Sequence, residues 1–146
     1  MFSFSVAVEI SAPASRVWRA LCDPAEVVAW DTGVVAARDA PADYPQPGQH
    51  VRWRYANGPF RVLHDRPQEV APERTLRSLI SNGPLRIDET YRLDPAGGGT
   101  RLTATLLLRV PWPVVGALAE RAVFGPATRR AVTASLAAIK RHCEAG

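Results

Sequence analysis

The chain contains 146 residues, of which 47% are hydrophobic and 22% are charged, and its formal net charge is +4 at pH 7. These values are typical of one globular domain with its own core, so we expect a single domain over residues 1–146. No apolar run reaches the roughly 20 residues needed to span a bilayer, and residues 1–11 lack the features of a signal peptide. We therefore predict a cytoplasmic protein without integral membrane association.

Arginine supplies almost all of the positive charge, since Lys140 is the only lysine. Together with the abundant alanine and proline, this usage favours a bacterial source. The arginines are dispersed along the chain and are not interleaved with aromatic residues, so we expect a solvated basic surface and no nucleic-acid partner. The cysteines, Cys22 and Cys143, have no metal-like spacing, and we expect no disulfide between them.

The first thirty residues predict a strand and two short helices. Apolar residues alternate from Phe4 to Ile10, which indicates a half-buried strand. After a Ser-Ala-Pro turn, the pattern V-W-x-x-L over residues 17–21 places three apolar side chains on one helical face. The pair Asp23-Pro24 then begins a second helical segment that ends at Trp30.

The middle of the chain reads as a series of strands joined by turns. A loop rich in Pro, Gly and Asp over residues 39–49 precedes an alternating strand, in which Val51, Trp53 and Tyr55 share one face. Asn57-Gly58 indicates a hairpin, after which a strand begins at Phe60 and continues toward Val70. In this strand we expect the inner face to carry Phe60, Val62 and His64. Residues 74–81 form a further strand before the turn at Asn82-Gly83.

Two long strands and a helix complete the chain. The inner face of residues 85–94 carries Leu85, Ile87, Glu89, Tyr91 and Leu93, and that of residues 100–110 carries Leu102, Ala104, Leu106, Leu108 and Val110. The opposite, solvent-facing side carries Arg86, Arg92, Arg101 and Thr103. A helix over residues 113–143, with an apolar stripe of Leu118, Val123, Ala127, Val132, Leu136 and Ile139, covers the sheet. Pro126 should kink or divide this helix.

The order of these elements resembles the START-related helix-grip superfamily (SRPBCC), which includes birch-pollen-allergen-like and polyketide cyclase/dehydrase-like proteins. The likeness is carried by the opening strand with its Ala-Pro, V-W-x-x-L, Asp-Pro and Trp30, by E-T-Y-R-L-D-P at residues 89–95 and by the C-terminal helix. It implies an α+β helix-grip fold. In that fold a curved antiparallel sheet of about six or seven strands wraps around a long C-terminal helix, with two short helices after the first strand. A cavity between sheet and helix is also implied.

Aromatic residues from separate elements converge on the expected cavity, and such residues commonly line small-molecule pockets. A packed core without a pocket is the alternative. The predicted ligand-binding residues are Trp30, Trp53, Tyr55, Phe60, Val62, Ile87, Tyr91, Leu106, Val123 and Phe124, with Trp112 at the start of the helix.

Glu89 and His64 are the candidates for proton transfer. Glu89 shares the inner face of its strand, where an unpaired carboxyl has a raised pKa and can act as a general acid or base. We favour the structural alternative, in which Glu89 is paired with an arginine or with backbone donors. His64 suits proton transfer near neutral pH, but a lone histidine at a strand end, in a polar segment such as HDRPQ, is more often exposed or structural. We expect no cofactor and no metal, since no ligand cluster, P-loop or G-x-G-x-x-G motif is present.

Three functions stay open at this point. A binding module would hold a small hydrophobic molecule, lipid-like or aromatic and polyketide-like, in the cavity. A polyketide cyclase/dehydrase-type enzyme would use Glu89, His64 or Tyr91 for proton transfer on a ligand held in the same place. An interaction protein would instead engage a partner through its helix or its basic convex face. A large cavity that contains Glu89 and a tyrosine favours the second function, and a collapsed core favours the third.

Overall fold

A computed structural model describes residues 2–111, 118 and 120–145. Its strands, in chain order, are β1 (Phe2–Ile10), β2 (Val34–Ala37), β3 (Val51–Tyr55), β4 (Val62–Ala71), β5 (Thr75–Asn82), β6 (Leu85–Ala96) and β7 (Gly99–Arg109). Its helical segments are α1 (Ala14–Cys22), α2 (Pro24–Trp30), a π-helical turn η1 (Glu120–Phe124) and α4 (Gly125–Glu144). Among the described helices, none combines the length and the apolar character needed to cross a membrane.

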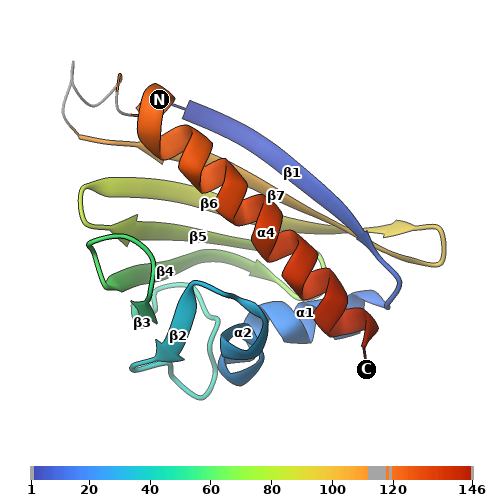
Figure 1. The fold of residues 1–146 in the computed structure, drawn as a ribbon. Coiled ribbons are helices and arrows are strands. Elements are labelled where there is room, and N and C mark those ends of the chain that lie inside the picture. The colour runs from blue at the N-terminus through green and yellow to red at the C-terminus, as the bar shows by residue number, and fades with distance from the viewer. Residues whose placement is uncertain (1, 112–117, 119, 146) are drawn as a thin grey trace.

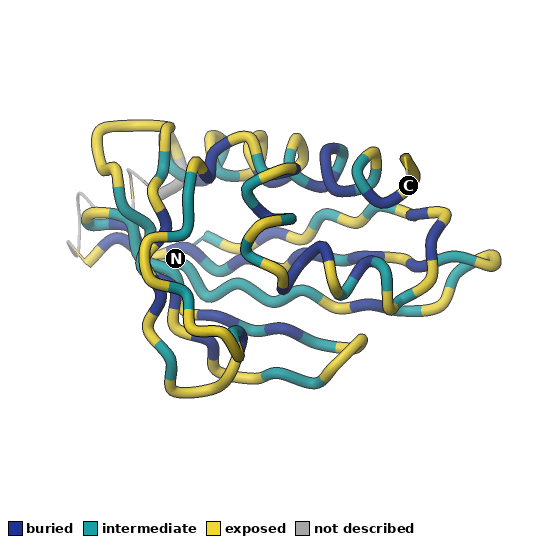
Figure 2. The backbone as a smooth tube through the Cα atoms, turned by 90° about the horizontal axis from the view of Figure 1, so that it is seen from below, coloured by how far each residue is buried: buried dark blue, intermediate teal, exposed yellow. Residues whose placement is uncertain are grey.

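The strands form one antiparallel sheet in the order β1-β7-β6-β5-β4-β3-β2. The sheet curves around α4, which crosses its concave face, and α1 and α2 lie at one end of the sheet (Figure 1). A view from below separates the helix layer from the sheet layer (Figure 2). Seven strands, two short helices after β1 and a long C-terminal helix confirm the predicted helix-grip fold.

Local sequence accounts for the two short helices. Pro24 occupies the first turn of α2, where a missing N–H is harmless, and the Asp23 side chain accepts a 2.9 Å hydrogen bond from the Ala25 N–H. The Trp30 indole N–H donates to the Ala20 carbonyl of α1 at 2.8 Å, which holds the two helices together. The predicted boundaries of α2, Asp23-Pro24 and Trp30, are confirmed.

The two long strands have the predicted faces. The inner residues of β6 and β7 include Leu85, Leu93, Leu102, Leu106 and Leu108, all of which are buried. Arg86, Arg92 and Arg101 are exposed on the other side. Because the side-chain period of a strand is two, this agreement also excludes a one-residue slip of β6 or β7.

The C-terminal helix differs in its first half from the predicted stripe. Val132, Leu136 and Ile139 are buried in the core, but Leu118 and Val123 are 70% and 61% exposed. A π-helical turn precedes Gly125, and α4 starts there with Pro126 in its first turn. A π-helical turn contains more residues than an α-helical turn, so apolar residues of η1 and α4 at α-helical spacing do not fall on one continuous face. Residues 113–117 of the predicted helix lie outside the described residues.

Helix α4 covers only part of the sheet. It packs chiefly against β1, with smaller contacts to β7, α1 and α2. Among the described elements, α4 contacts β3 to β6 more weakly than it contacts β1. The candidate site lies between α4 and this part of the concave face.

Candidate functional site

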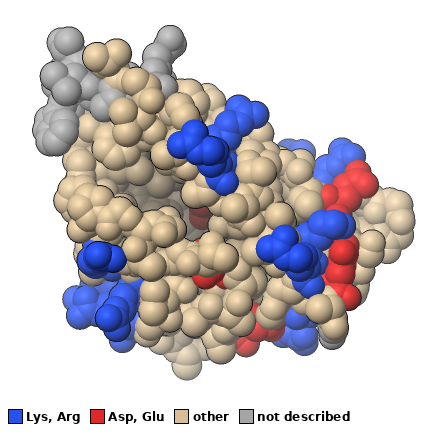
Figure 3. Space-filling view, in the orientation of Figure 1, with Lys and Arg blue, Asp and Glu red and all other residues tan. Residues whose placement is uncertain are grey.

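A cavity of about 170 Å³ lies between α4, α2 and the concave face of β3 to β7. It opens on the face of the molecule seen in Figure 3, where a hollow has acidic atoms at its base. Aliphatic and aromatic side chains form most of its wall. The polar side chains of the wall are Asp31, Tyr44, Tyr55, Asp65, Ser78, Glu89, Tyr91, Thr128 and Ser135.

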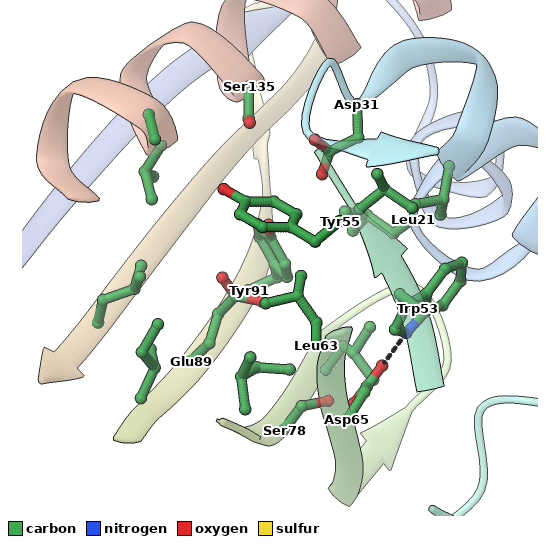
Figure 4. A pocket seen from close by; sticks show the side chains of 18 of the residues that line it. Leu21, Asp31, Trp53, Tyr55, Leu63, Asp65, Ser78, Glu89, Tyr91 and Ser135 are labelled. Atoms are coloured by element: carbon green, nitrogen blue, oxygen red, sulfur yellow. Dashed lines mark hydrogen bonds between the residues drawn. The ribbon is translucent and has the colours of Figure 1, made fainter. Parts of the chain in front are cut away.

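The structure brings most of the predicted site residues to this wall. Glu89, the first candidate for proton transfer, lies there with the aromatic and apolar residues of its surroundings, and Figure 4 shows it beside Tyr91. The predicted ligand-binding residues on the wall are Trp30, Trp53, Tyr55, Ile87, Tyr91 and Leu106. They come from α2, β3, β6 and β7, so segments distant in sequence meet at one cavity.

Other predicted residues do not reach the wall. Phe60 is 41% exposed and lies before the start of β4. Its ring packs over Gly83, in the turn between β5 and β6. Val123 is exposed in η1, and Phe124 packs against the core. Trp112 lies outside the described residues. Val62 and His64 lie on the face of β4 that points away from the cavity.

The register of β4 corrects the predicted parity by one residue. Trp53 is paired with Leu63 and Val51 with Asp65, and directly opposed residues point to the same face of a sheet. Leu63 and Asp65 therefore line the cavity, whereas Val62 and His64 point away from it. The sequence had two adjacent apolar residues here, Val62 and Leu63, so alternation alone could not choose between the two faces.

His64 has a different environment from the one predicted. Its Nδ1 atom lies 2.9 Å from Nε2 of His50 on the convex side of the sheet. Burial lowers the pKa of His64, and the charges of His50 and of nearby arginines lower it further. His64 therefore lies on the other face of the sheet from the cavity.

Asp65 is a polar residue of the wall that the sequence did not reveal. It is 4% exposed, and its Oδ2 atom accepts hydrogen bonds from the Tyr44 hydroxyl at 2.6 Å and the Trp53 indole N–H at 3.0 Å. Burial raises the pKa of Asp65, although interactions with the side chains of Tyr44, Trp53 and Ser78 oppose this rise. Its Oδ1 atom is buried and has no hydrogen bond of good geometry among the residues that the structure describes.

Asp31 is the second acid that sequence reasoning missed. It follows the last residue of α2, and its Oδ1 atom accepts a 2.9 Å hydrogen bond from the Gly33 N–H. Burial raises the pKa of Asp31, and the backbone hydrogen bonds from Gly33 and Val34 partly offset the effect. An acid directly after Trp30, a residue already expected in the cavity, was the only signal in the sequence.

Glu89 is unpaired, which corrects the favoured interpretation. No arginine and no backbone N–H among the described residues contacts its carboxyl, which stands among Tyr91, Asp65 and Asp31. Burial raises the pKa of Glu89 to about 8, and the charges of Asp65 and Asp31 add to the rise. Burial also raises the pKa of Tyr91 well above its usual value, and the charge of Glu89 adds to this rise. At neutral pH most Glu89 side chains are thus protonated and able to donate a hydrogen bond.

Almost the whole length of the chain matches one known protein family. Residues 1–144 match the model of the family described as polyketide cyclase / dehydrase and lipid transport. None of the curated proteins has a significant sequence similarity to this chain.

Solved structures share the fold at low sequence identity. Protein CV1439 from Chromobacterium violaceum is 20% identical, with a TM-score of 0.78 over 97% of this chain and 96% of that one. The Aha1 dimer from Colwellia psychrerythraea is 15% identical, with a TM-score of 0.75 over 99% and 97%. DynU16, a protein of the dynemicin biosynthetic locus, is 23% identical, with a TM-score of 0.65 over 92% and 45%. These likenesses concern the fold, whereas the match over residues 1–144 shows that the chain belongs to the polyketide cyclase/dehydrase and lipid-transport family.

Proposed function

We propose that this protein binds a small, largely apolar molecule in the cavity between α4 and the concave face of the sheet. The observation that carries this proposal is a cavity of about 170 Å³ with a mostly apolar wall and a carboxyl group, that of Glu89, which has no partner among the residues that the structure describes. Engineered cavities of about 150 Å³ hold a molecule of the size of benzene. The present conformation therefore suits one ring or a short branched chain.

Two features support binding over a simply packed core. Helix α4 packs chiefly against β1, and its residues Thr128, Val132 and Ser135 face the concave sheet across the cavity. The wall also combines apolar side chains with tyrosines and acids, a combination that orients a ligand as well as excluding water. A ligand would bury the apolar wall and supply the hydrogen-bond acceptor that protonated Glu89 lacks.

The test measures binding directly. Native mass spectrometry of the purified protein would detect a small molecule that copurifies with it, and an apolar fluorescent probe would be titrated into the ligand-free protein. Ile87→Trp places a larger side chain on the cavity wall and should abolish saturable binding of the probe. Leu79→Trp, on the other face of the sheet where Leu79 is 40% exposed, is the matched control and should bind like wild type.

If neither a copurified molecule nor micromolar binding of any apolar probe is found, the proposal of ligand binding is wrong. Binding that survives Ile87→Trp with unchanged affinity would place the ligand elsewhere on the protein.

A second candidate function is proton transfer of the cyclase/dehydrase kind. The specific observation is the pKa of Glu89, about 8, because a general acid or base is most effective when its pKa lies near the working pH. As a carboxylate, Glu89 would take a proton from the carbon next to a ketone, and the C–H electron pair would form the C=C bond of an enolate. Return of a proton from Glu89 to that carbon completes an exchange.

Exchange with solvent tests this candidate without knowledge of the natural substrate. Acetophenone in D2O would gain deuterium at its methyl carbon faster with wild-type protein than without it, by roughly 10²–10⁴-fold for one positioned base. Glu89→Gln should remove the acceleration. Asp88→Asn, which changes a carboxyl on the opposite face of the same strand, should keep it. Equal rates with wild type and Glu89→Gln would exclude Glu89 as the base.

A further inference from the structure

The cavity collects negative charge without any positive charge. Three acids line it: Asp31 at the end of α2, Asp65 on β4 and Glu89 on β6. Among the described residues that line the cavity, none is a lysine, arginine or histidine. The carboxyl groups of Asp31 and Glu89 point toward the same central space, near the ring of Tyr55 (Figure 4). The chain as a whole has a formal net charge of +4, so the sign of the charge that gathers at the cavity is opposite to that of the whole chain.

Two of the acids have carboxyl oxygen atoms without a hydrogen bond of good geometry among the described residues. Asp65 is 4% exposed, and its Oδ1 atom has no hydrogen bond of good geometry among the described residues, although the Ser78 side chain interacts with the carboxyl and lowers its pKa. Glu89 has neither a hydrogen bond nor an ion pair in the part of the chain that the structure describes. Buried carboxyl groups are normally paired, because an unpaired charge away from water is unfavourable. As carboxylates, these groups lack a hydrogen-bond donor or a cation in the described part of the protein, whereas protonated Glu89 lacks an acceptor.

The geometry distinguishes an organic cation from a metal ion. Among the described residues, no group of three or more His, Cys, Asp or Glu side chains is close enough to hold a metal. The wall around the acids consists instead of aromatic rings, those of Trp53, Tyr55 and Tyr91, and of aliphatic side chains. Aromatic faces attract ammonium groups, most strongly where water is excluded.

We propose that the ligand of this cavity is an organic cation, with an ammonium group beside Asp31, Asp65 and Glu89 and an apolar body against the aromatic wall. This inference rests on the proposed function, because it names the chemical class of the molecule that the cavity binds. It excludes fatty acids and other anionic lipids as preferred ligands, since a carboxylate would be repelled by the same acids.

Proton linkage follows from the groups that face Glu89. These are Asp31 from the α2–β2 turn, Asp65 from β4, Tyr91 from its own strand and Tyr44 from the loop before β3. Tyr55 of β3 also lies on the wall, Cys22 of α1 lies near Tyr44, and the described wall residues of α4 do not titrate. Burial and the acids give Glu89 a pKa of about 8, so a bound cation would favour its carboxylate form and release a proton. The affinity for a permanent cation should therefore rise with pH, by up to about tenfold per unit below pH 8.

The experiment compares two probes of nearly equal shape and size. Phenyltrimethylammonium carries a permanent positive charge, and tert-butylbenzene is its neutral isostere. Titrations followed by NMR at pH 6.5 and pH 8.5 would give the dissociation constant of each probe. We expect the cation to bind at least about tenfold more tightly than its isostere at pH 8.5, with a smaller advantage at pH 6.5. The affinity for tert-butylbenzene should be almost independent of pH.

Variants assign the effect to the cavity. Glu89→Gln keeps the shape of the side chain and should lose most of the pH dependence of cation binding, and Asp65→Asn should lower the affinity. Asp88→Asn removes the neighbouring carboxylate on the other face of β6, where Asp88 pairs with Arg77 at 2.8 Å, and should bind both probes like wild type. The NMR spectrum of each variant shows whether it is folded. Because Glu89→Gln preserves every recorded hydrogen bond, it serves as the decisive variant if Asp65→Asn is unfolded.

The outcomes separate this inference from the proposed function. If tert-butylbenzene binds as tightly as the cation at pH 8.5, the cavity binds ligands but is not selective for cations, and the inference is wrong. The same conclusion follows if Glu89→Gln keeps the full pH dependence. If neither probe binds at millimolar concentration and no apolar probe binds either, the proposed function fails as well.

Discussion

The Tyr44 hydroxyl donates a 2.6 Å hydrogen bond to Asp65 Oδ2, and this contact connects the loop between β2 and β3 to the cavity wall. The ring of Tyr44 also packs edge-on against Trp53, at 5.6 Å between the ring centroids. Because Trp53 donates to the same Asp65 oxygen, three side chains from the loop, β3 and β4 form one buried polar group. These hydrogen bonds stabilise an acid on the inner face of β4, where an apolar side chain is the usual occupant.

Removal of the Tyr44 hydroxyl should destabilise the protein. In Tyr44→Phe, Asp65 loses one of its two hydrogen bonds of good geometry, and a lost bond to a charged group lowers the free energy of unfolding by about 1.5–3 kcal/mol. Urea denaturation at pH 7 would measure the change. Tyr55→Phe is the control, since the Tyr55 hydroxyl has only a 3.5 Å contact with Asn57, and its change should stay below about 0.5 kcal/mol. Equal losses in the two variants would contradict the assigned role of Tyr44.

Glu89 should make the protein less stable as pH rises. Its pKa is about 8 in the folded protein and 4.5 as a reference, so between these values the folded state holds one proton more than the unfolded state. The contribution of Glu89 to stability is therefore complete below pH 4.5 and decreases by up to about 1.4 kcal/mol per pH unit until pH 8. Denaturation of wild type and Glu89→Gln from pH 5 to pH 9 would show Glu89→Gln becoming relatively more stable as pH rises. A constant difference would mean that the carboxyl is solvated or paired.

Glu26 should have the opposite pH dependence. It accepts hydrogen bonds from Arg16 at 2.7 Å and Arg19 at 2.9 Å on α1, and lies 2.8 Å from His142 of α4. Burial acts to raise the pKa of Glu26, but the bonds from His142, Arg16 and Arg19 together lower it. Glu26 therefore stabilises the fold above pH 4.5, and this stabilisation is lost as pH falls through its lower folded pKa.

Glu26→Gln should accordingly lower the free energy of unfolding by about 1–3 kcal/mol at pH 7, and the difference from wild type should shrink below pH 4. Glu9→Gln is the control, because the pair of Glu9 with Arg101 is exposed, with side chains 66% and 53% accessible. Its loss should not exceed about 0.5 kcal/mol. The assignment fails if Glu9→Gln costs as much stability as Glu26→Gln.

The two thiols should be almost inert in the folded protein. Cys22 and Cys143 are buried and free, and burial raises the pKa of Cys22 to about 12 and also raises that of Cys143. Since the thiolate is the reactive form, labelling by a disulfide reagent at pH 8 should be at least about a hundredfold slower than in denaturant. Rapid labelling of Cys22 or Cys143 in the native state would show that the part of α1 or α4 around that thiol opens to solvent.

The residues of β6 and β7 were predictable because their environment is simple. Each strand alternates between a buried and a solvent-facing side, and both run through the centre of an antiparallel sheet, so polarity reports the face directly. The position of Glu89 on the inner face followed from this alternation. Its lack of a partner did not, because an arginine on any other strand is a candidate partner in the sequence, and only the register of the sheet excludes such a pair.

The sequence by itself determined the order of elements except β2, the boundaries of α2 and the faces of the long strands, because turn residues and period-two patterns act over a few neighbouring residues. Tertiary structure alone decided that Leu63 and Asp65, rather than Val62 and His64, face the cavity, since pairing with Trp53 and Val51 sets the register of β4. It also decided that Asp31 and Asp65 stand near Glu89. An inward acid contradicts local polarity, and it is stable only because Tyr44 and Trp53, distant in the chain, donate hydrogen bonds to it.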